Sequence, residues 1–178
     1  MRCVPLIARW LVLATSLVVA VAHATPIPPL AARSLEGTPV ALPAALPEGP
    51  VLLVVGFTRA SRAQTEAWSR RLARADAVPT GVAVYQVAVI GDVPALFRGA
   101  VAKGIRQGVP TGLHARFLLV EEGIEDWKRL ARVDAADAAC LVLLDARRRV
   151  VWRHAGPVGD TAWAELTAAL ARLSGPPG

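Results

Sequence analysis

Ser61 is the first candidate for chemistry in this sequence. It lies in GFTRASRAQTEAW, residues 56–68, which follows the apolar run VLLVV and is typical of a turn from a buried strand into a helix. A serine hydroxyl is nucleophilic only beside a general base, and neither His114 nor His154 has a recognisable triad spacing to it. Ser61 and Gln64 instead match the S-x-x-Q capping box, worth about 1 kcal/mol. We predict that Ser61 caps the helix and is not catalytic.

The second candidate is a lone thiol. The chain has two cysteines, Cys3 and Cys140, and Cys3 falls within a predicted leader. A mature chain with one thiol can neither form an internal disulfide nor cycle a dithiol within itself. Cys140 begins the apolar run CLVLL, which favours a small buried thiol that fills the core. The alternative is a thiol that forms a mixed disulfide with a partner.

Arginine and histidine side chains are the candidates for ligand binding. Arg59 and Arg62 flank the predicted helix start, where they and the backbone N–H groups could receive a carboxylate or another anion; a solvated pair is the favoured interpretation. His114 is expected to be a loop histidine bonded to backbone rather than a base or a ligand. Because His23, His114 and His154 are far apart in the sequence, we predict no metal site and no cofactor.

Hydrophobic periodicity predicts the elements that position these residues. An alternating stretch around Glu36-Gly37 indicates a hairpin, and all-apolar runs indicate buried strands. Strands are expected at residues 51–57, 82–90 and 116–120 and in a second hairpin at 140–156, with helices at 61–72, 93–106, 121–133 and 160–173. This order predicts an α/β fold, a mixed sheet flanked by helices with an N-terminal β-hairpin.

The first 24 residues are typical of a secretory signal peptide. Arg2 and Arg9 precede the apolar run LVLATSLVVAVA, and Ala22-His23-Ala24 matches a cleavage site. Cleavage after Ala24 would leave a domain at residues 25–174 with a disordered tail at 175–178. The domain is then periplasmic or secreted, with no dedicated membrane span. The alternative is an uncleaved segment that anchors the chain to the inner membrane.

The charge of the chain gives little sign of a partner. The net charge is +6, and losing Arg2 and Arg9 with the leader leaves 6 − 2 = +4. No dense basic run with interleaved aromatic residues is present, so nucleic-acid binding is not expected. A solvated basic surface is the favoured interpretation, and attraction to anionic lipid would be unspecific.

Two stretches resemble the thioredoxin-like superfamily. Thr58-x-x-Ser61 has the spacing of the peroxiredoxin T-x-x-C motif with serine in the place of the cysteine. The later segment CLVLLDARRRVVWRHAGP is similar to the thioredoxin segment that follows the cis-proline. In that register Ala139 occupies the cis-proline position, Asp145 matches, Arg148 replaces the turn glycine and Gly156 closes the strand. The resemblance implies a degenerate thioredoxin-like fold without its cysteines, with Cys140 near the former active-site groove.

A looser likeness runs from Leu30 to Leu173. The chain resembles the assembly-factor family of the mitochondrial ATP synthase membrane sector in a basic helix, a V-P-x-x-x-H loop and a D…W…G segment. The matching residues are Leu96, Phe97, Arg98, Val109, Pro110, His114, Asp145, Trp152 and Gly156. This resemblance implies a thioredoxin-like fold and a role as chaperone of a membrane subunit.

These observations favour an exported, non-redox domain that binds a protein or peptide at the former active-site face. The partner can be a membrane-associated protein. Fold alone does not establish function, so two alternatives stay open. One is a thiol oxidoreductase that works through Cys140 with external thiols. The other is an anion-binding or small-ligand module centred on Arg59 and Arg62.

Overall fold

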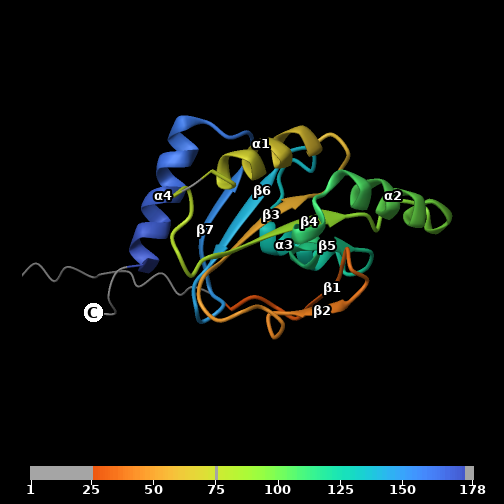
Figure 1. Cartoon of the computed structure of the whole chain (residues 1–178), viewed down its shortest axis with the longest axis horizontal. Helices are drawn as coiled ribbons and strands as arrows, with labels where there is room; N and C mark the ends of the chain where they lie inside the picture. Colours follow the sequence, from red (N-terminus) through yellow and green to blue (C-terminus); the bar gives the residue numbers. More distant parts are fainter. Residues whose placement is uncertain (1–25, 75, 175–178) are drawn as a thin grey trace, which may run out of the picture.

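Seven strands form a single mixed sheet in the order β2-β1-β5-β4-β3-β6-β7 (Figure 1). The computed structural model describes residues 26–74 and 76–174, so the predicted signal peptide and tail lie outside the described residues. The strands are β1 (Leu30–Ser34), β2 (Pro39–Leu42), β3 (Val51–Gly56), β4 (Ala83–Val89), β5 (Phe117–Val120), β6 (Cys140–Leu144) and β7 (Val150–Ala155). The predicted α/β fold, with an N-terminal hairpin of β1 and β2, is confirmed.

The sheet has a parallel centre and antiparallel margins. Strands β3, β4 and β5 run parallel, whereas β6 and β7 on one side and β1 and β2 on the other pair antiparallel. The central strand β3 is apolar throughout and buried from Val51 to Val55, as expected for a strand covered on both faces. The turn that follows β3 therefore starts from a buried strand in the interior of the sheet.

The helices begin and end close to their predicted positions. They are α1 (Arg62–Leu72), α2 (Ala95–Gly108), α3 (Ile124–Ala131) and α4 (Asp160–Ser174), with a 3-10 helix, η1 (Thr111–Arg116), in the predicted loop before β5. Helix α2 starts at Ala95 instead of Val93 because Pro94 holds an extended conformation and disfavours helix in the residue before it. Among the described residues, no helix has the length and apolar character needed to cross a membrane.

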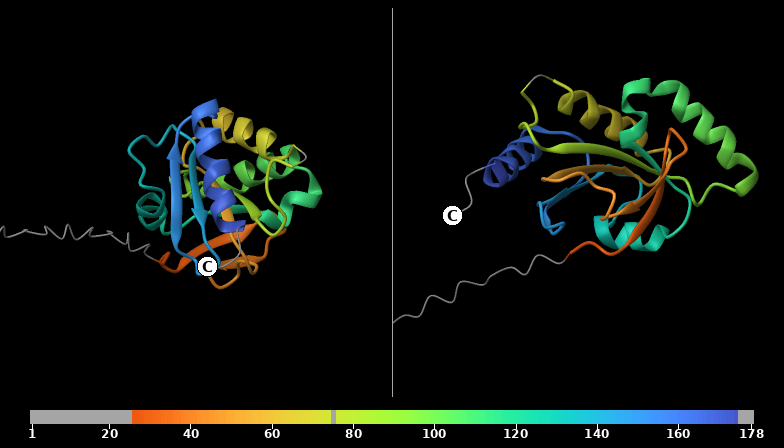
Figure 2. Two further views of the ribbon diagram at one scale, coloured as in Figure 1. Left: turned by 90° about the vertical axis from the view of Figure 1, so that its left-hand side faces the viewer. Right: turned by 60° about the horizontal axis from the view of Figure 1, so that its bottom comes forward.

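Helices cover both faces of the sheet. Apolar side chains of α1 and α4 pack with Leu52 and Val54 of β3, whereas those of α3 pack with Leu53 and Val55. The right-hand view of Figure 2 shows α1 and α2 on one side of the sheet and α3 on the other, and the left-hand view shows α1 and α4 side by side. Because β3 side chains alternate between the faces, the sheet separates two cores.

In the turn between β6 and β7, Arg148 stands where the thioredoxin segment has a glycine, and its side chain has a structural role. Arg148 has a φ of +62°, a left-handed conformation that favours glycine. Its guanidinium donates hydrogen bonds to the carbonyls of Leu46, Pro47 and Gly49. Asp145 accepts bonds from the N–H groups of Arg147 and Arg149, both at 2.9 Å, which fixes the turn. The side chain of Arg148 thus ties the loop before β3 to this hairpin.

Candidate functional site

The turn from β3 into α1 is held unusually close to the sheet. A Cβ atom added to Gly56 would lie 2.9 Å from Ser61 Oγ and 3.3 Å from Thr65 Cγ2. Real Cβ contacts are essentially never so short as the first of these, so a larger residue at Gly56 would displace the side chain of Ser61. Glycine thus leaves room for the Ser61 hydroxyl, a role that no pattern in the sequence indicates.

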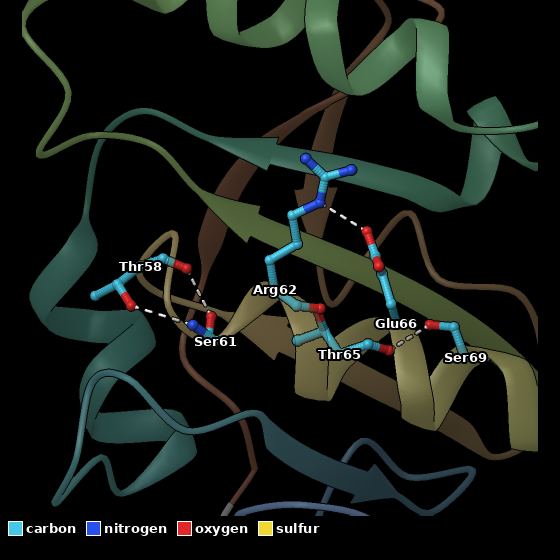
Figure 3. Close-up of polar contacts among 6 residues, drawn as sticks. All are labelled: Thr58, Ser61, Arg62, Thr65, Glu66 and Ser69. Atoms are coloured by element: carbon cyan, nitrogen blue, oxygen red, sulfur yellow. Dashed lines mark hydrogen bonds and ion pairs between the residues drawn. The ribbon is translucent and has the colours of Figure 1, made fainter.

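The predicted capping box is wrong. Ser61 has helical backbone angles (φ −68°, ψ −13°), and its side chain makes no capping bond. Its hydroxyl instead donates to the carbonyl of Thr58 at 2.8 Å, and Ser61 is only 1% exposed (Figure 3). Thr58 Oγ1 in turn accepts the N–H of Ser61 at 3.4 Å. The same hydroxyl donates to Asp137 at 2.6 Å, which joins the turn to the loop before β6.

Gln64 and Trp68, one turn apart on α1, close a ring of hydrogen bonds with the sheet. Gln64 Oε1 accepts the N–H of Ala139 at 3.1 Å, and the carbonyl of Ala139 accepts the N–H of Gly156 at 2.9 Å. The carbonyl of Gly156 then accepts Trp68 Nε1–H at 3.0 Å. We call Gln64, Trp68, Ala139 and Gly156 the α1 clamp. It locks α1 to the start of β6 and the end of β7.

The clamp explains what replaces the cis-proline. Within residues 26–74 and 76–174 the cis peptide bond is that between Leu42 and Pro43, so Ala139 follows a trans bond. Unlike proline, Ala139 has a backbone N–H, and this residue is fully buried. A buried N–H needs a partner, and Gln64 provides it. Both backbone groups of Ala139 are thus engaged within the protein.

Replacing Gln64 with alanine is expected to lower the free energy of unfolding by about 1–3 kcal/mol, because the buried N–H of Ala139 loses its acceptor. Gln64→Glu keeps an oxygen at that position and should retain most of the stability. Urea unfolding monitored by tryptophan fluorescence gives both values. Equal losses in the two variants would mean that the amide oxygen does not hold Ala139.

Cys140 lies on the opposite side of the sheet from α1. Ala139 packs among the residues of α1 and α4, whereas Cys140 packs with β3, β4 and α3 in the other core. The expectation that its thiol lies near the former active-site groove is therefore wrong, because neighbouring strand residues point to opposite faces. The expectation of a buried core thiol is confirmed: Cys140 is fully buried. Burial, with a smaller contribution from the charge of Asp134, raises the pKa of Cys140 to about 11.

The two arginines at the turn do not act as a matched pair. Both are exposed, but Arg62 forms an ion pair with Glu66 at 2.7 Å, on the same face of α1 (Figure 3). One of the two positive charges expected to receive an anion is therefore already compensated within the chain. The anion-binding hypothesis keeps Arg59 and the helix start, and it stays a prediction.

The remaining residues of the looser motif hold local structure. His114 Nε2 lies 2.9 Å from the carbonyl of Val109, so the expected loop histidine bonded to backbone is confirmed. Pro110 directly precedes η1. Trp152 is half-buried on the face of the sheet that α1 covers. Gly156, with a φ of +127°, belongs to the α1 clamp. The structure places these positions in different loops and strands and does not gather them into one site.

His154 of β7 is partly buried beside the rings that pack on α1. Its ring lies between Trp68 and Trp152, with ring centroids 5.5 Å and 5.9 Å away. Among the described residues, its Nε2 atom is buried without a hydrogen-bond partner. The sequence could have predicted this position of His154, because side chains two residues apart in a strand, here Trp152 and His154 of β7, lie on one face of the sheet. In the described part of the chain, no three acidic, histidine or cysteine side chains gather to hold a metal.

No protein-family model and no curated protein matches the sequence. Solved structures do resemble it. A DsbF homologue from Corynebacterium diphtheriae has a TM-score of 0.57 and 14% identity, and the match covers 85% of this chain and 88% of that one. The chain has a thioredoxin-like fold. This fold was predicted from the order of elements and from the turn at Ser61.

Two further structures share the fold. The thioredoxin domain of a thiol-disulfide oxidoreductase from Bacteroides vulgatus has a TM-score of 0.53 and 15% identity, with 83% of this chain and 96% of that chain covered. The exposed lipoprotein thioredoxin Etrx1 from Streptococcus pneumoniae has a TM-score of 0.54 and 12% identity, with 82% and 100% covered. In this chain the turn from β3 into α1, residues 56–68, contains no cysteine.

Proposed function

We propose that this chain is an exported, non-redox domain that binds a protein or peptide partner at the former active-site face and assists its assembly. One observation carries the proposal. The turn from β3 into α1, residues 56–68, contains no cysteine, and its Ser61 and Gln64 side chains bond to Thr58 and Ala139 of the same chain. Neither supplies a thiolate, which is the species that attacks a disulfide.

The proposed docking surface consists of two exposed segments that lie beside each other. Residues 58–60 are exposed at the end of the turn, and Asp134, Ala135 and Asp137 are exposed before β6. The hydrogen bond from Thr58 to Asp137 joins the two segments. Because the α1 clamp fixes α1 behind them, this surface is preorganised, which lowers the entropic cost of binding. The surface carries charges of both signs and suits a polypeptide better than a simple anion.

Export is part of the proposal. The predicted leader supports it, and so does the likeness of fold to an exposed lipoprotein thioredoxin. The resemblance to the ATP synthase assembly factors suggests the kind of partner, a subunit of a membrane complex. In a strain that lacks the gene, the amount of assembled ATP synthase should fall if that role applies. An unchanged amount on a native gel would remove the ATP synthase role and leave the docking proposal standing.

Site-specific crosslinking tests the docking surface directly. A photoreactive amino acid in place of Ala60, which is exposed in the turn, should form a discrete crosslinked product with the partner in the cell. The same residue in place of Glu165, exposed on α4, is the matched control and should form none. Equal products at both positions, or none at Ala60, would count against this surface.

The second candidate function is thiol exchange through Cys140. It is favoured by the likeness of fold to a thiol-disulfide oxidoreductase and opposed by the burial of the thiol. In a Cys3→Ser variant, we expect native Cys140 to react with an aromatic disulfide reagent at least about 100-fold more slowly than in urea. Two pKa units lower the thiolate fraction by that factor at neutral pH, and burial adds to the effect. Native and unfolded protein that react equally fast would revive this function.

The stability of the fold should also depend on the charge of Cys140. The unfolded thiol ionises near its ordinary pKa of 9.0, whereas the folded thiol keeps its proton up to about 11. The stabilisation is complete below about pH 9 and is lost as the pH rises to about 11, since the unfolded state releases its proton first. Unfolding free energies of the wild type and Cys140→Ala should converge over that window. A constant difference between them would mean that the thiol does not titrate as described.

A further inference from the structure

Helix α2 presents two large apolar side chains to solvent. Leu96 is 87% exposed and Phe97 is 57% exposed, the two highest values among the large hydrophobic residues of the described chain. No residue of α2 is fully buried, and Val101 and Ile105 make the partial contacts with the sheet. Figures 1 and 2 show α2 projecting beyond the sheet on the side away from α4. Adjacent apolar residues on a projecting helix indicate an interaction surface.

Helix α2 and the segment that follows it carry charge of a single sign. From Val93 to Val120 the sequence contains no aspartate or glutamate, and it carries the basic residues Arg98, Lys103, Arg106 and Arg116. Glu125 raises the pKa of Lys128 on α3, and Asp92, the acidic residue that precedes this stretch, adds a smaller contribution. The exposed side of α2 therefore combines apolar and positive groups with no negative ones of its own.

Local contacts hold α2 in this projecting position. Arg98 donates from Nε to the carbonyl of Val93 at 2.8 Å and from an Nη to that of Gly91 at 2.7 Å. The loop before α2 is thereby fixed to the first turn of the helix. No acidic residue occupies that first turn and no side chain caps it, so the positive end of the helix dipole is not compensated there. Leu96 and Phe97 lie within this same turn.

We propose that α2 docks on an anionic phospholipid surface, with Leu96 and Phe97 entering the boundary between headgroups and acyl chains. Lys103 and Arg106, both exposed, would then contact the lipid phosphates. A bilayer is favoured over a protein because the apolar groups stand on a convex, projecting helix. Along the same helix, a Cβ added to Gly99 or Gly104 would meet nothing within 4 Å, so α2 is open to solvent at these positions too. The proposal is independent of the docking surface at Thr58–Ala60.

Flotation with lipid vesicles tests this proposal on the full chain. With vesicles of equal parts phosphatidylcholine and phosphatidylglycerol, Leu96→Ser/Phe97→Ser should lower the bound fraction at least about 10-fold relative to wild type. Lys103→Glu/Arg106→Glu should have a similar effect that shrinks at high salt. The control Val151→Ser/Arg172→Glu changes one exposed apolar and one exposed basic residue elsewhere and should bind like wild type. Binding equal in all three variants would overturn the proposal.

A second readout separates α2 from any lipid affinity of the N-terminal residues. In a Cys3→Ser chain, an environment-sensitive dye on Ala100→Cys, exposed on α2, should shift to shorter wavelength with these vesicles. The same dye on Ala168→Cys, exposed on α4, should not. A shift at Ala100 that is as large with pure phosphatidylcholine, or no shift at all, would contradict an anionic surface as the target.

Discussion

Replacing Ser61 and Gln64 together with cysteine is expected to turn this chain into a thiol oxidoreductase. The two positions lie three residues apart at the start of α1, the spacing of a C-x-x-C pair. A thiolate at a helix N-terminus is stabilised by the dipole, and α1 has no acidic residue in its first turn to oppose it. Wild type should not reduce insulin in the presence of dithiothreitol above the rate without protein, whereas the double variant should do so measurably.

The single variants Ser61→Cys and Gln64→Cys are the controls, because each adds one thiol without its partner. Neither should form an internal disulfide, which mass spectrometry after alkylation distinguishes from the double variant. The double variant will also be less stable, by about 1–3 kcal/mol, since Ala139 loses the Gln64 acceptor. If no disulfide forms between positions 61 and 64, the turn does not keep C-x-x-C geometry. If wild type is already active, the non-redox proposal is wrong.

The fold was predictable because its signals are local. The all-apolar run at Val51–Val55 and the amphipathic segments between strands determine most element boundaries, and the order of elements limits the topologies. Even Arg148 was predicted at the glycine position of its turn. The sequence could not show which contacts Arg148 makes, because the carbonyls that it bonds, those of Leu46, Pro47 and Gly49, lie about a hundred positions away.

The sequence predicted where the turn into α1 lies, but the hydrogen bonds that it predicted there were wrong. Ser61 and Gln64 satisfy a local capping pattern, and a local pattern was the evidence available from sequence. In the fold, Gln64 bonds to Ala139, which is 75 residues away, because the buried N–H of Ala139 needs an acceptor. Thr58 bonds to Asp137 across a similar separation and also accepts the N–H of Ser61. Long-range hydrogen bonds overrode the short-range motif.

The face on which Cys140 lies follows the same logic. The backbone of Cys140 lies near the turn because Cys140 follows Ala139 in the sequence. Its side chain lies in the other core, because successive side chains of a strand point to opposite faces. The resemblance to thioredoxins, which draws attention to this segment, cannot show which of two neighbouring residues faces α1. Pairing partners decide that: Cys140 pairs with Val55, and both belong to the core covered by α3.

Replacing Trp68 with alanine is expected to be the most destabilising single change at the site, by about 3–5 kcal/mol. Trp68 is fully buried and packs against the rings of His154 and Trp163, with centroids 5.5 Å and 6.3 Å away. Its Nε1–H also holds the carbonyl of Gly156. Trp68→Phe separates the two effects, because it keeps most of the packing and removes the donor. That variant should lose about 1–3 kcal/mol.

Trp163 offers a matched comparison for this experiment. It is half-buried and stacks under the Arg71 guanidinium at 4.5 Å from the ring centroid, at the surface between α1 and α4. Trp163→Phe should cost less than Trp68→Phe, although both exchange the same side chains. In native-state hydrogen exchange, Trp68→Phe should also expose the amides of Ala139 and Gly156, since these belong to the α1 clamp. If the two variants are equally stable and both amides stay protected, then packing alone holds α1, and the docking surface owes its rigidity to something other than the clamp.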